Sequence, residues 1–120
     1  MVTFSCLGSN YAVAMAIYGQ RLGLPCEVVM SYKLPNLALR RNPLLTQHFG
    51  ARLHYAKTFP GAGVRLGSVL FRSWVEDKVW PYFTRAGASA PIGAMGFVRA
   101  GLELAAQIRA GICPMPDRLF

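Results

Sequence analysis

The stretch VTFSCLGSNYAVAMAIYGQRLGL, residues 2–24, decides the fold of this chain. Its first five residues are β-prone and predict a short strand, which a polar turn from Gly8 to Asn10 follows. Small and apolar residues then run from Tyr11 to Leu22 and predict a helix, and Gly23 is a typical residue to end it. A strand, a tight turn and a helix begin a βαβ unit.

Two interpretations of this turn are open. Ser9 or Asn10 can cap the helix, because either side chain can accept a hydrogen bond from a first-turn amide. The same helix end also attracts a carboxylate or a phosphate. Its first N–H groups have no helical partners, and the helix dipole adds positive potential there.

Strands and helices alternate along the rest of the chain. Further strands are expected at Cys26–Met30, Arg52–Ala56 and Pro81–Thr84, and further helices at Leu37–Phe49, Val64–Val79 and Ile92–Ala110. Loops are expected at Tyr32–Asn36 and at Pro60–Gly63, and a last strand is expected to start at Arg118. The positions expected to face inward in the third helix are Leu66, Val69, Leu70, Trp74 and Val79.

Strands separated by helices of this length predict a parallel sheet with helices on both faces, a three-layer αβα fold. Right-handed crossovers favour a four-stranded sheet of order 3-2-1-4, in one α/β domain of residues 1–120. The topological switch point then lies between the first and fourth strands. Their carboxyl ends carry the Gly8–Asn10 turn and a second turn, Gly87–Ser89, so we expect Ser9 and Ser89 to face one crevice.

The composition is that of an ordered chain. Its 120 residues suffice for one compact domain, and 53% hydrophobic residues with a mean hydropathy of +0.31 argue against disorder. Every apolar run is broken by charge, Gly or Pro well before 18 residues, so no membrane span is expected. The chain enters a strand-like run without a basic leader, and a cytoplasmic location is the expectation.

The formal charge of +8 comes from 13 basic and five acidic residues. The basic residues are scattered singly, except for the pair Arg40-Arg41, and form no basic face interleaved with aromatic residues. Nucleic-acid binding is therefore not favoured. The pattern is more typical of a solvated surface, or of a surface that meets an acidic partner domain.

The cysteines and histidines do not predict a metal site. Cys6, Cys26 and Cys113 are an odd number without CxxC spacing, so neither zinc nor a disulfide framework is expected. Cys6 and Cys26 fall in predicted strands, where we expect them to be small core residues. His48 and His54 have no nearby ligand partners in the sequence and are expected on helix or strand surfaces.

Three motifs together resemble one known family. GSNYAVAMAIYGQRLGLPCEVVM at residues 8–30, LPNLALRRNPLLTQHFGARLHY at 34–55 and AGASAPIGAMGFVRAGLELAAQI at 86–108 are similar to segments of the 1-aminocyclopropane-1-carboxylate deaminase and D-cysteine desulfhydrase family. These are fold-type II enzymes that depend on pyridoxal phosphate and are similar to the tryptophan synthase β subunit. The resemblance implies the small domain of such a lyase or hydrolase, with a small amino acid as substrate.

The resemblance also implies a substrate site. The family's Ser-Asn pair in the first turn binds the substrate carboxylate beside the cofactor, which would give that role to Ser9 and Asn10. The next position, usually His or Gln, is Tyr11 here. In the second turn Gly87 and Ser89 match the family, and all five residues are expected to bind substrate.

Two alanines depart from the family pattern. Ala88 stands where the second turn usually has a second glycine, and Ala90 stands where it has a second serine. These departures, with Tyr11, bear on the identity of the substrate.

No catalytic residue carries over from the family. Its Schiff-base lysine lies in a Gly-Gly-Asn-Lys context before the opening strand, whereas Lys33, Lys57 and Lys78 have other contexts. The family's phosphate loop follows a strand that Phe120 would only begin. We therefore expect no covalent capture of pyridoxal phosphate, and no activity, by these 120 residues without a missing large domain.

Two other classes of function are compatible with the sequence. One is a non-catalytic module that holds a small anion or amino acid in the switch-point crevice. The other is an interaction domain whose Arg-rich, partly apolar surface docks onto a partner or forms a homo-oligomer.

Overall fold

The structure, a computed structural model, describes residues 1–31 and 37–118. The elements are β1 (Val2–Cys6), α1 (Asn10–Arg21), β2 (Glu27–Ser31), α2 (Leu37–His48), β3 (Arg52–Ala56), α3 (Phe59–Asp77), β4 (Phe83–Thr84), a 3-10 turn (Ala86–Ala88) and α4 (Pro91–Arg109). The loop expected at residues 32–36 lies outside the described residues, and so do residues 119–120 of the strand expected to start at Arg118.

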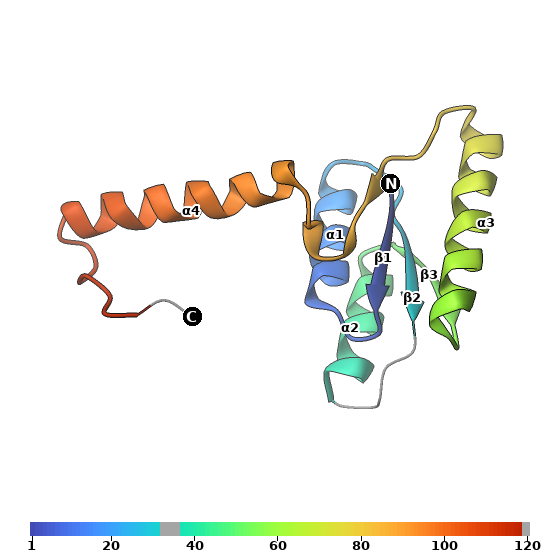
Figure 1. The fold of residues 1–120 in the computed structure, drawn as a ribbon, viewed down its shortest axis with the longest axis horizontal. Coiled ribbons are helices and arrows are strands. Elements are labelled where there is room, and N and C mark those ends of the chain that lie inside the picture. The colour runs from blue at the N-terminus through green and yellow to red at the C-terminus, as the bar shows by residue number, and fades with distance from the viewer. Residues whose placement is uncertain (32–36, 119–120) are drawn as a thin grey trace. The chain divides into compact units, whose positions relative to one another are not determined.

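The four strands form one parallel sheet of order β3-β2-β1-β4, which confirms the predicted order 3-2-1-4. Val2 of β1 lies opposite Glu27 of β2 on one side and opposite Phe83 of β4 on the other. The edge strand β4 has two residues and ends opposite Thr3, so it pairs only with the first part of β1. Figure 1 shows β1 and β2 side by side in the middle of this sheet.

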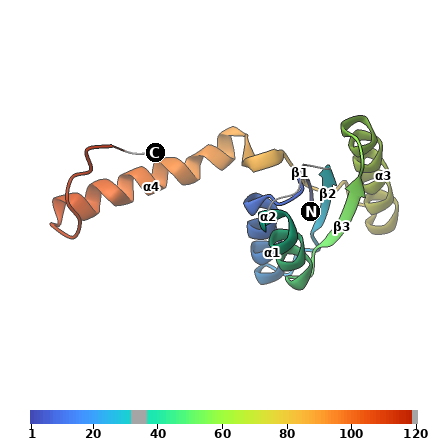
Figure 2. The same ribbon diagram turned by 90° about the horizontal axis from the view of Figure 1, so that it is seen from below.

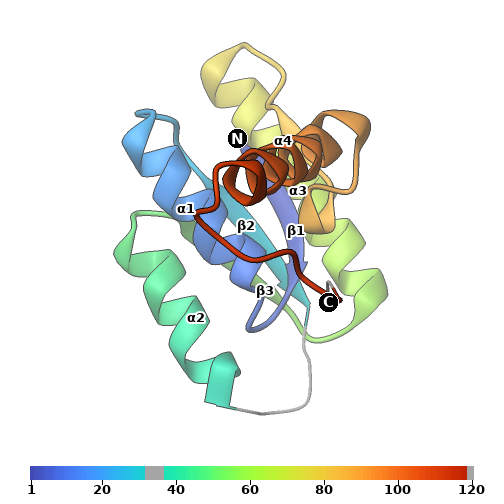
Figure 3. The ribbon, with the colours of Figure 1, turned by 90° about the vertical axis from the view of Figure 1, so that its left-hand side faces the viewer.

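Helices cover both faces of the sheet, as predicted. Figures 1 and 2 show α1 and α2 on one side of the strands and α3 on the other, and Figure 3 looks toward the side of α1 and α2. Successive residues of a strand point to opposite faces, so Val28 and Met30 join one core cluster and Val29 joins the other. A strand buried on both faces reads as the continuous apolar run that β2 has.

Each core cluster takes its helix residues from one side of the sheet. Ala12 and Ala16 of α1 pack with the first cluster, and Ala62 and Val69 of α3 pack with the second. The small side chains of α1 let this helix lie close to the strands. This packing holds the start of α1 at the carboxyl end of β1.

The chain divides into two compact units, residues 1–87 and 88–120. The first holds the sheet with α1, α2 and α3. The second holds α4, which ends at Arg109 and is followed by Gly111 with a φ of +70°. That these units form one domain stays a prediction. Within the described part of the chain, no helix is long and apolar enough to cross a membrane.

The helix α3 begins earlier than predicted. Its first residue is Phe59, so the predicted Pro60–Gly63 loop is wrong and this segment is the first helical turn. The Gly61 N–H donates to the Thr58 hydroxyl over 3.2 Å, which caps the helix, and a proline suits a first turn because its missing N–H would have no partner there. The Thr58 cap and the proline favour a helix here, although Gly61 and Gly63 have low helix propensity.

The inward face of α3 was predicted correctly only in its first half. Val69 is buried, and Leu66 and Leu70 pack against the same core cluster. Trp74 and Val79 were wrongly expected to face inward, since they are 44% and 69% exposed. Beyond Leu70 the apolar side chains of this segment lie on the surface.

The inward face of α2 also differs from the apolar pattern. Leu44, which recurs at helical spacing with other apolar residues, is exposed, whereas Asn42 and Thr46 are buried. The helix continues through Pro43 to His48 as one element. Of these two buried polar side chains, Asn42 contacts the first turn of the chain, and Thr46 bonds to the Asn42 carbonyl within the helix.

Candidate functional site

The turn after β1 has the geometry that its sequence predicts. Ser9 is the N-cap of α1, and the Ala12 N–H donates to its Oγ over 3.4 Å. The Ser9 N–H donates to the Cys6 carbonyl over 3.2 Å, which closes the turn. Ser9 and Tyr11 are partly exposed and Asn10 is exposed. The three predicted binding residues of this turn therefore lie at the surface, at the carboxyl end of a central strand.

Gly8 is required in this turn for two reasons. Its φ is +85°, a left-handed conformation that side chains other than glycine rarely adopt. In addition, a Cβ atom at this position would lie 2.9 Å from the Leu39 Cδ2 and 3.3 Å from the Leu39 Cα. The absence of a side chain thus lets α2 approach the turn closely.

Asn42 of α2 holds the turn by two hydrogen bonds. Its Nδ2 donates to the Gly8 carbonyl over 2.7 Å and to the Asn10 Oδ1 over 2.8 Å. Sequence reasoning missed this residue, although it stands in the second motif of the family resemblance. Its helical phase with Leu39 and Thr46, three residues before and four after, could have indicated that it faces the sheet.

The second predicted turn is also shaped by positive φ angles. Gly87 has a φ of +65° within the 3-10 turn, and Ala88 has a φ of +54°. Ala90 is the N-cap of α4 without a side-chain hydrogen bond, and Pro91 is the first residue of that helix, one residue before the predicted start at Ile92. Ala88 thus adopts a backbone conformation that favours glycine, the residue that the family resemblance has at this position.

That the two turns face one crevice stays a prediction. The strands β1 and β4 are parallel neighbours, so their carboxyl ends point to the same edge of the sheet. Gly87 ends the first unit, however, and Ser89 belongs to the second. Ser89 does make an interaction in the structure and is not a free hydroxyl.

The carboxyl edge of the sheet carries a cavity of about 210 Å³. Leu7, Ser31, Tyr55, Ala56 and Lys57 line it. These residues belong to or directly follow β1, β2 and β3. Lys57 is exposed and adds a positive charge at the carboxyl ends of the strands, where the first turn also lies.

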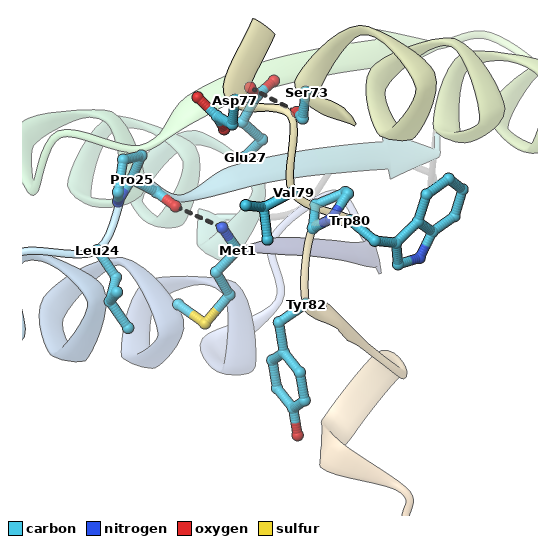
Figure 4. Close-up of a pocket in the computed structure, with 10 residues that line it drawn as sticks. Met1, Leu24, Pro25, Glu27, Ser73, Asp77, Val79, Trp80 and Tyr82 are labelled. Carbon is cyan, nitrogen blue, oxygen red and sulfur yellow. Dashed lines mark hydrogen bonds between the residues drawn. The ribbon is translucent and has the colours of Figure 1, made fainter. Parts of the chain in front are cut away.

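A larger cavity, of about 350 Å³, lies at the opposite edge (Figure 4). Its lining includes Glu27 and Asp77 together with Trp80 and Tyr82. Figure 4 shows the bond from the Met1 nitrogen to the Pro25 carbonyl, 2.7 Å long, at its border. Ligands of open α/β sheets bind at the carboxyl ends of the strands, so this amino-edge cavity is not the expected site.

Glu27 is a buried carboxylate at the start of β2. Its Oε2 lies 2.7 Å from the His54 Nε2 and 2.5 Å from the Arg72 Nη2, and the Ser73 hydroxyl donates to its Oε1 over 3.4 Å. The expectation that His54 lies on the surface is wrong, because its side chain is only 14% exposed. The carboxylate draws the histidine inward, since a buried charge needs partners. His48 is exposed, as expected.

The cysteines divide by environment. Cys6 is exposed, so its predicted core position is wrong, because it is the last residue of β1. Cys26 is buried, and this burial raises the pKa of its thiol. Among the described residues, no group of histidine, cysteine and acidic side chains could hold a metal ion.

A parallel sheet of order 3-2-1-4, with a braced polar turn after its central strand, defines an open α/β fold, a class of protein that binds its ligands at the carboxyl ends of the strands. No model of a known protein family matches the chain. The D-cysteine desulfhydrase of Salmonella paratyphi B is 26% identical to it over 112 residues, and those of Salmonella newport and Salmonella heidelberg match equally. The aligned part is 89% of this chain and 34% of that enzyme.

Solved structures agree with these relatives. The structure of an ACC deaminase homologue matches 88% of this chain with a TM-score of 0.69 and 27% identity. A threonine deaminase from T.th. matches 94% with a TM-score of 0.66, and at 23% identity this likeness concerns the fold alone. The chain covers 33% of each structure, so it spans about a third of the length of its relatives. The resemblance that the three motifs carry is confirmed.

Proposed function

We propose that residues 1–120 form the substrate-carboxylate side of the site of a pyridoxal-phosphate-dependent deaminase or desulfhydrase that acts on a small amino acid. The similarity to D-cysteine desulfhydrases and to an ACC deaminase homologue supports this proposal. The observation that carries it is the turn from Gly8 to Asn10, which α2 braces at the carboxyl end of a central strand.

The groups of this turn suit a carboxylate. The Ser9 oxygen accepts a hydrogen bond from Ala12, which leaves its hydroxyl proton able to bind a ligand oxygen. Asn10 is exposed and carries an amide, and the start of α1 adds N–H groups and the positive end of the helix dipole. We propose that Ser9, Asn10 and Tyr11 bind substrate, together with Gly87 and Ser89 of the second turn.

Pyridoxal phosphate, when bound, supplies the electron sink for chemistry at the amino acid's α carbon. The described residues do not fit this cofactor by themselves. Lys57 borders the cavity at the carboxyl edge, and Lys78 follows Asp77, which lines the cavity at the other edge. Neither has the family's sequence context, and Lys33 lies outside the described residues. We propose that the 120-residue polypeptide has no activity alone.

Calorimetric titration with D-cysteine tests the binding role. Cysteamine, which is D-cysteine without its carboxylate, is the ligand control. We expect saturable binding of D-cysteine only, and a loss of about tenfold or more in affinity for Ser9→Ala and Asn10→Ala. Ser68→Ala is the matched control, because the Ser68 hydroxyl donates to the Arg65 carbonyl within α3, away from the turn. Equal binding of cysteamine, or full affinity in both variants, contradicts the proposal.

The inactivity is tested separately. The polypeptide is incubated with pyridoxal phosphate, reduced with borohydride and digested, and each lysine peptide is quantified by mass spectrometry. We expect low and unselective labelling, and no release of ammonia or sulfide from D-cysteine. Stoichiometric labelling of one lysine, together with turnover, contradicts this part of the proposal.

A second candidate function is association with another copy of this chain. Phe71, Trp74 and Trp80 form a surface aromatic cluster, in which the ring centroids of Phe71 and Trp74 lie 5.8 Å apart and those of Trp74 and Trp80 lie 6.4 Å apart. All three side chains are exposed, and exposed apolar patches mark interaction sites. Light scattering over a concentration series tests this candidate. A monomer at every concentration contradicts it, and a dimer that Trp80→Ser abolishes supports it.

A further inference from the structure

We propose that Asn42 fixes the orientation of the Asn10 side-chain amide, with the NH₂ group toward the ligand, and so makes the first turn selective for anions. This inference deepens the proposed function and rests on it. It assigns a positioning role to a buried residue of α2 that makes no contact with the ligand.

The Gly8 carbonyl sets the orientation of both amides. A carbonyl oxygen only accepts hydrogen bonds, so the atom of Asn42 that lies 2.7 Å from it must be the donor Nδ2. The same Nδ2 lies 2.8 Å from the Asn10 side chain. Because Nδ2 only donates, the atom of Asn10 that faces it must be the acceptor Oδ1. The backbone of the turn thus determines the orientation of Asn10 through Asn42.

The consequence is a defined polarity at the surface of the turn. Because Asn42 holds the Oδ1 atom of Asn10, the Nδ2 atom of this exposed side chain points away from Asn42. Its protons therefore add to the N–H groups at the start of α1, and both favour a carboxylate. The reverse orientation would present an acceptor oxygen, which repels an anion.

The burial of Asn42 keeps the orientation of the Asn10 amide fixed. Asn42 is 7% exposed, so water does not replace its two hydrogen bonds. Its position in α2 is fixed further by the Thr46 hydroxyl, which donates to the Asn42 carbonyl over 2.7 Å.

Two variants, each with an asparagine replaced by aspartate, address the orienting role of Asn42 and the ligand contact of Asn10. Asp at position 42 only accepts hydrogen bonds, so in Asn42→Asp the Asn10 amide turns its NH₂ inward and loses its outward donors. Asp at position 10 keeps an acceptor for Asn42 but removes the outward donors. We expect both variants to lose about tenfold or more in affinity for D-cysteine. Because each also places a negative charge near the ligand carboxylate, the side-chain amide protons, and not the affinities, distinguish the two roles.

NMR of the side-chain amides distinguishes these roles. In the wild type, we expect the Asn42 NH₂ protons to exchange slowly and to show NOEs to Gly8 and Asn10. We expect the Asn10 NH₂ protons to exchange fast and to shift on addition of acetate. Asn10→Asp should keep the slow Asn42 protons, whereas in Asn42→Asp the Asn10 protons should become slow and show NOEs to residue 42.

The outcomes also separate this inference from the proposed function. Slowly exchanging Asn10 protons in the wild type, or affinity in Asn42→Asp within about twofold of the wild type, overturns the inference. Should Asn42→Asp fail to fold, the wild-type and Asn10→Asp spectra still decide the orientation. If the wild type shows the expected exchange pattern but does not bind D-cysteine, Asn42 does orient the Asn10 amide, and the proposed function is contradicted.

Discussion

A Cβ atom on Gly8 would lie 2.9 Å from the Leu39 Cδ2, and this close approach joins the first turn to α2. The Leu39 backbone is also near, with its N and Cα both 3.3 Å from that position. A side chain at Gly8 would therefore meet backbone as well as a flexible methyl group. The proposed site depends on this contact, because Asn42 reaches the turn from the same helix.

Gly8→Ala is expected to lower the free energy of unfolding by about 2–4 kcal/mol, from left-handed strain together with overpacking. Gly50→Ala is the matched control. Its φ is +80°, and nothing lies within 4 Å of the added Cβ, so it should cost only about 1 kcal/mol. Urea unfolding followed by circular dichroism measures both. Equal losses in the two variants would show that the contact with Leu39 has no effect.

Variants of Ser9 separate the two roles of the first turn. Ser9→Ala removes the cap and should cost about 1 kcal/mol, with the hydrogen-bond length of 3.4 Å favouring a smaller loss. Ser9→Asp keeps a good cap, so its stability should stay within about 0.5 kcal/mol of the wild type. Its negative charge should still abolish carboxylate binding. Full binding by Ser9→Asp would mean that the serine only caps α1.

The sheet could be predicted from sequence because its strands are short, apolar and separated by helices. The bounds of β3 were predicted without error, and right-handed crossovers left few strand orders to consider. The start of α3 could not be predicted from glycine and proline content alone. There the Thr58 cap and a proline in the first turn favour a helix over a loop.

The candidate site was predicted only in part. The capping role of Ser9 follows from local sequence, because the cap and its partner amide are three residues apart. The role of Asn42 does not, since it depends on how α2 packs against a turn 32 residues earlier. The partial burial of His54 was missed for the same reason, because Glu27 lies on a neighbouring strand. Helical periodicity can indicate that Asn42 faces inward, but it does not indicate which distant polar group a buried side chain meets.

Glu27→Gln is expected to destabilise the fold by about 2 kcal/mol, because it removes charge-assisted hydrogen bonds to His54 and Arg72. The loss is kept modest because Arg72 is 43% exposed and solvent screens its charge. Glu103→Gln is the control, since its exposed hydrogen bond with Gln107 should contribute less than about 0.5 kcal/mol. Urea unfolding of both variants tests the difference.

Lys78 ends α3 in a left-handed conformation, with a φ of +56° and a ψ of +12°. Lys78→Gly should therefore raise the free energy of unfolding by about 1 kcal/mol. Lys78→Ala removes the same charge without relieving the strain, and its stability should stay close to that of the wild type. Thermal unfolding of the pair tests this prediction. An equal gain in both variants would assign the effect to charge.

The three cysteines should differ in their rates of alkylation. Burial raises the pKa of the Cys26 thiol, so at about pH 8.5 less of it is thiolate than for a thiol in water. Iodoacetamide should label exposed Cys6 first, partly exposed Cys113 next and buried Cys26 last. In concentrated urea, where burial is lost, the three rates should converge, and peptide mass spectrometry measures all of them.

The same shift predicts how stability depends on pH. A thiol whose pKa is raised in the folded state binds more protons there than in the unfolded chain at pH values between the two pKa values. Its contribution to stability is therefore complete below the unfolded pKa of about 8.5 and is lost as the pH rises through the folded value. Stability that increases as the pH rises above about 8.5, or Cys26 labelling as fast as that of Cys6, would contradict the burial of this thiol.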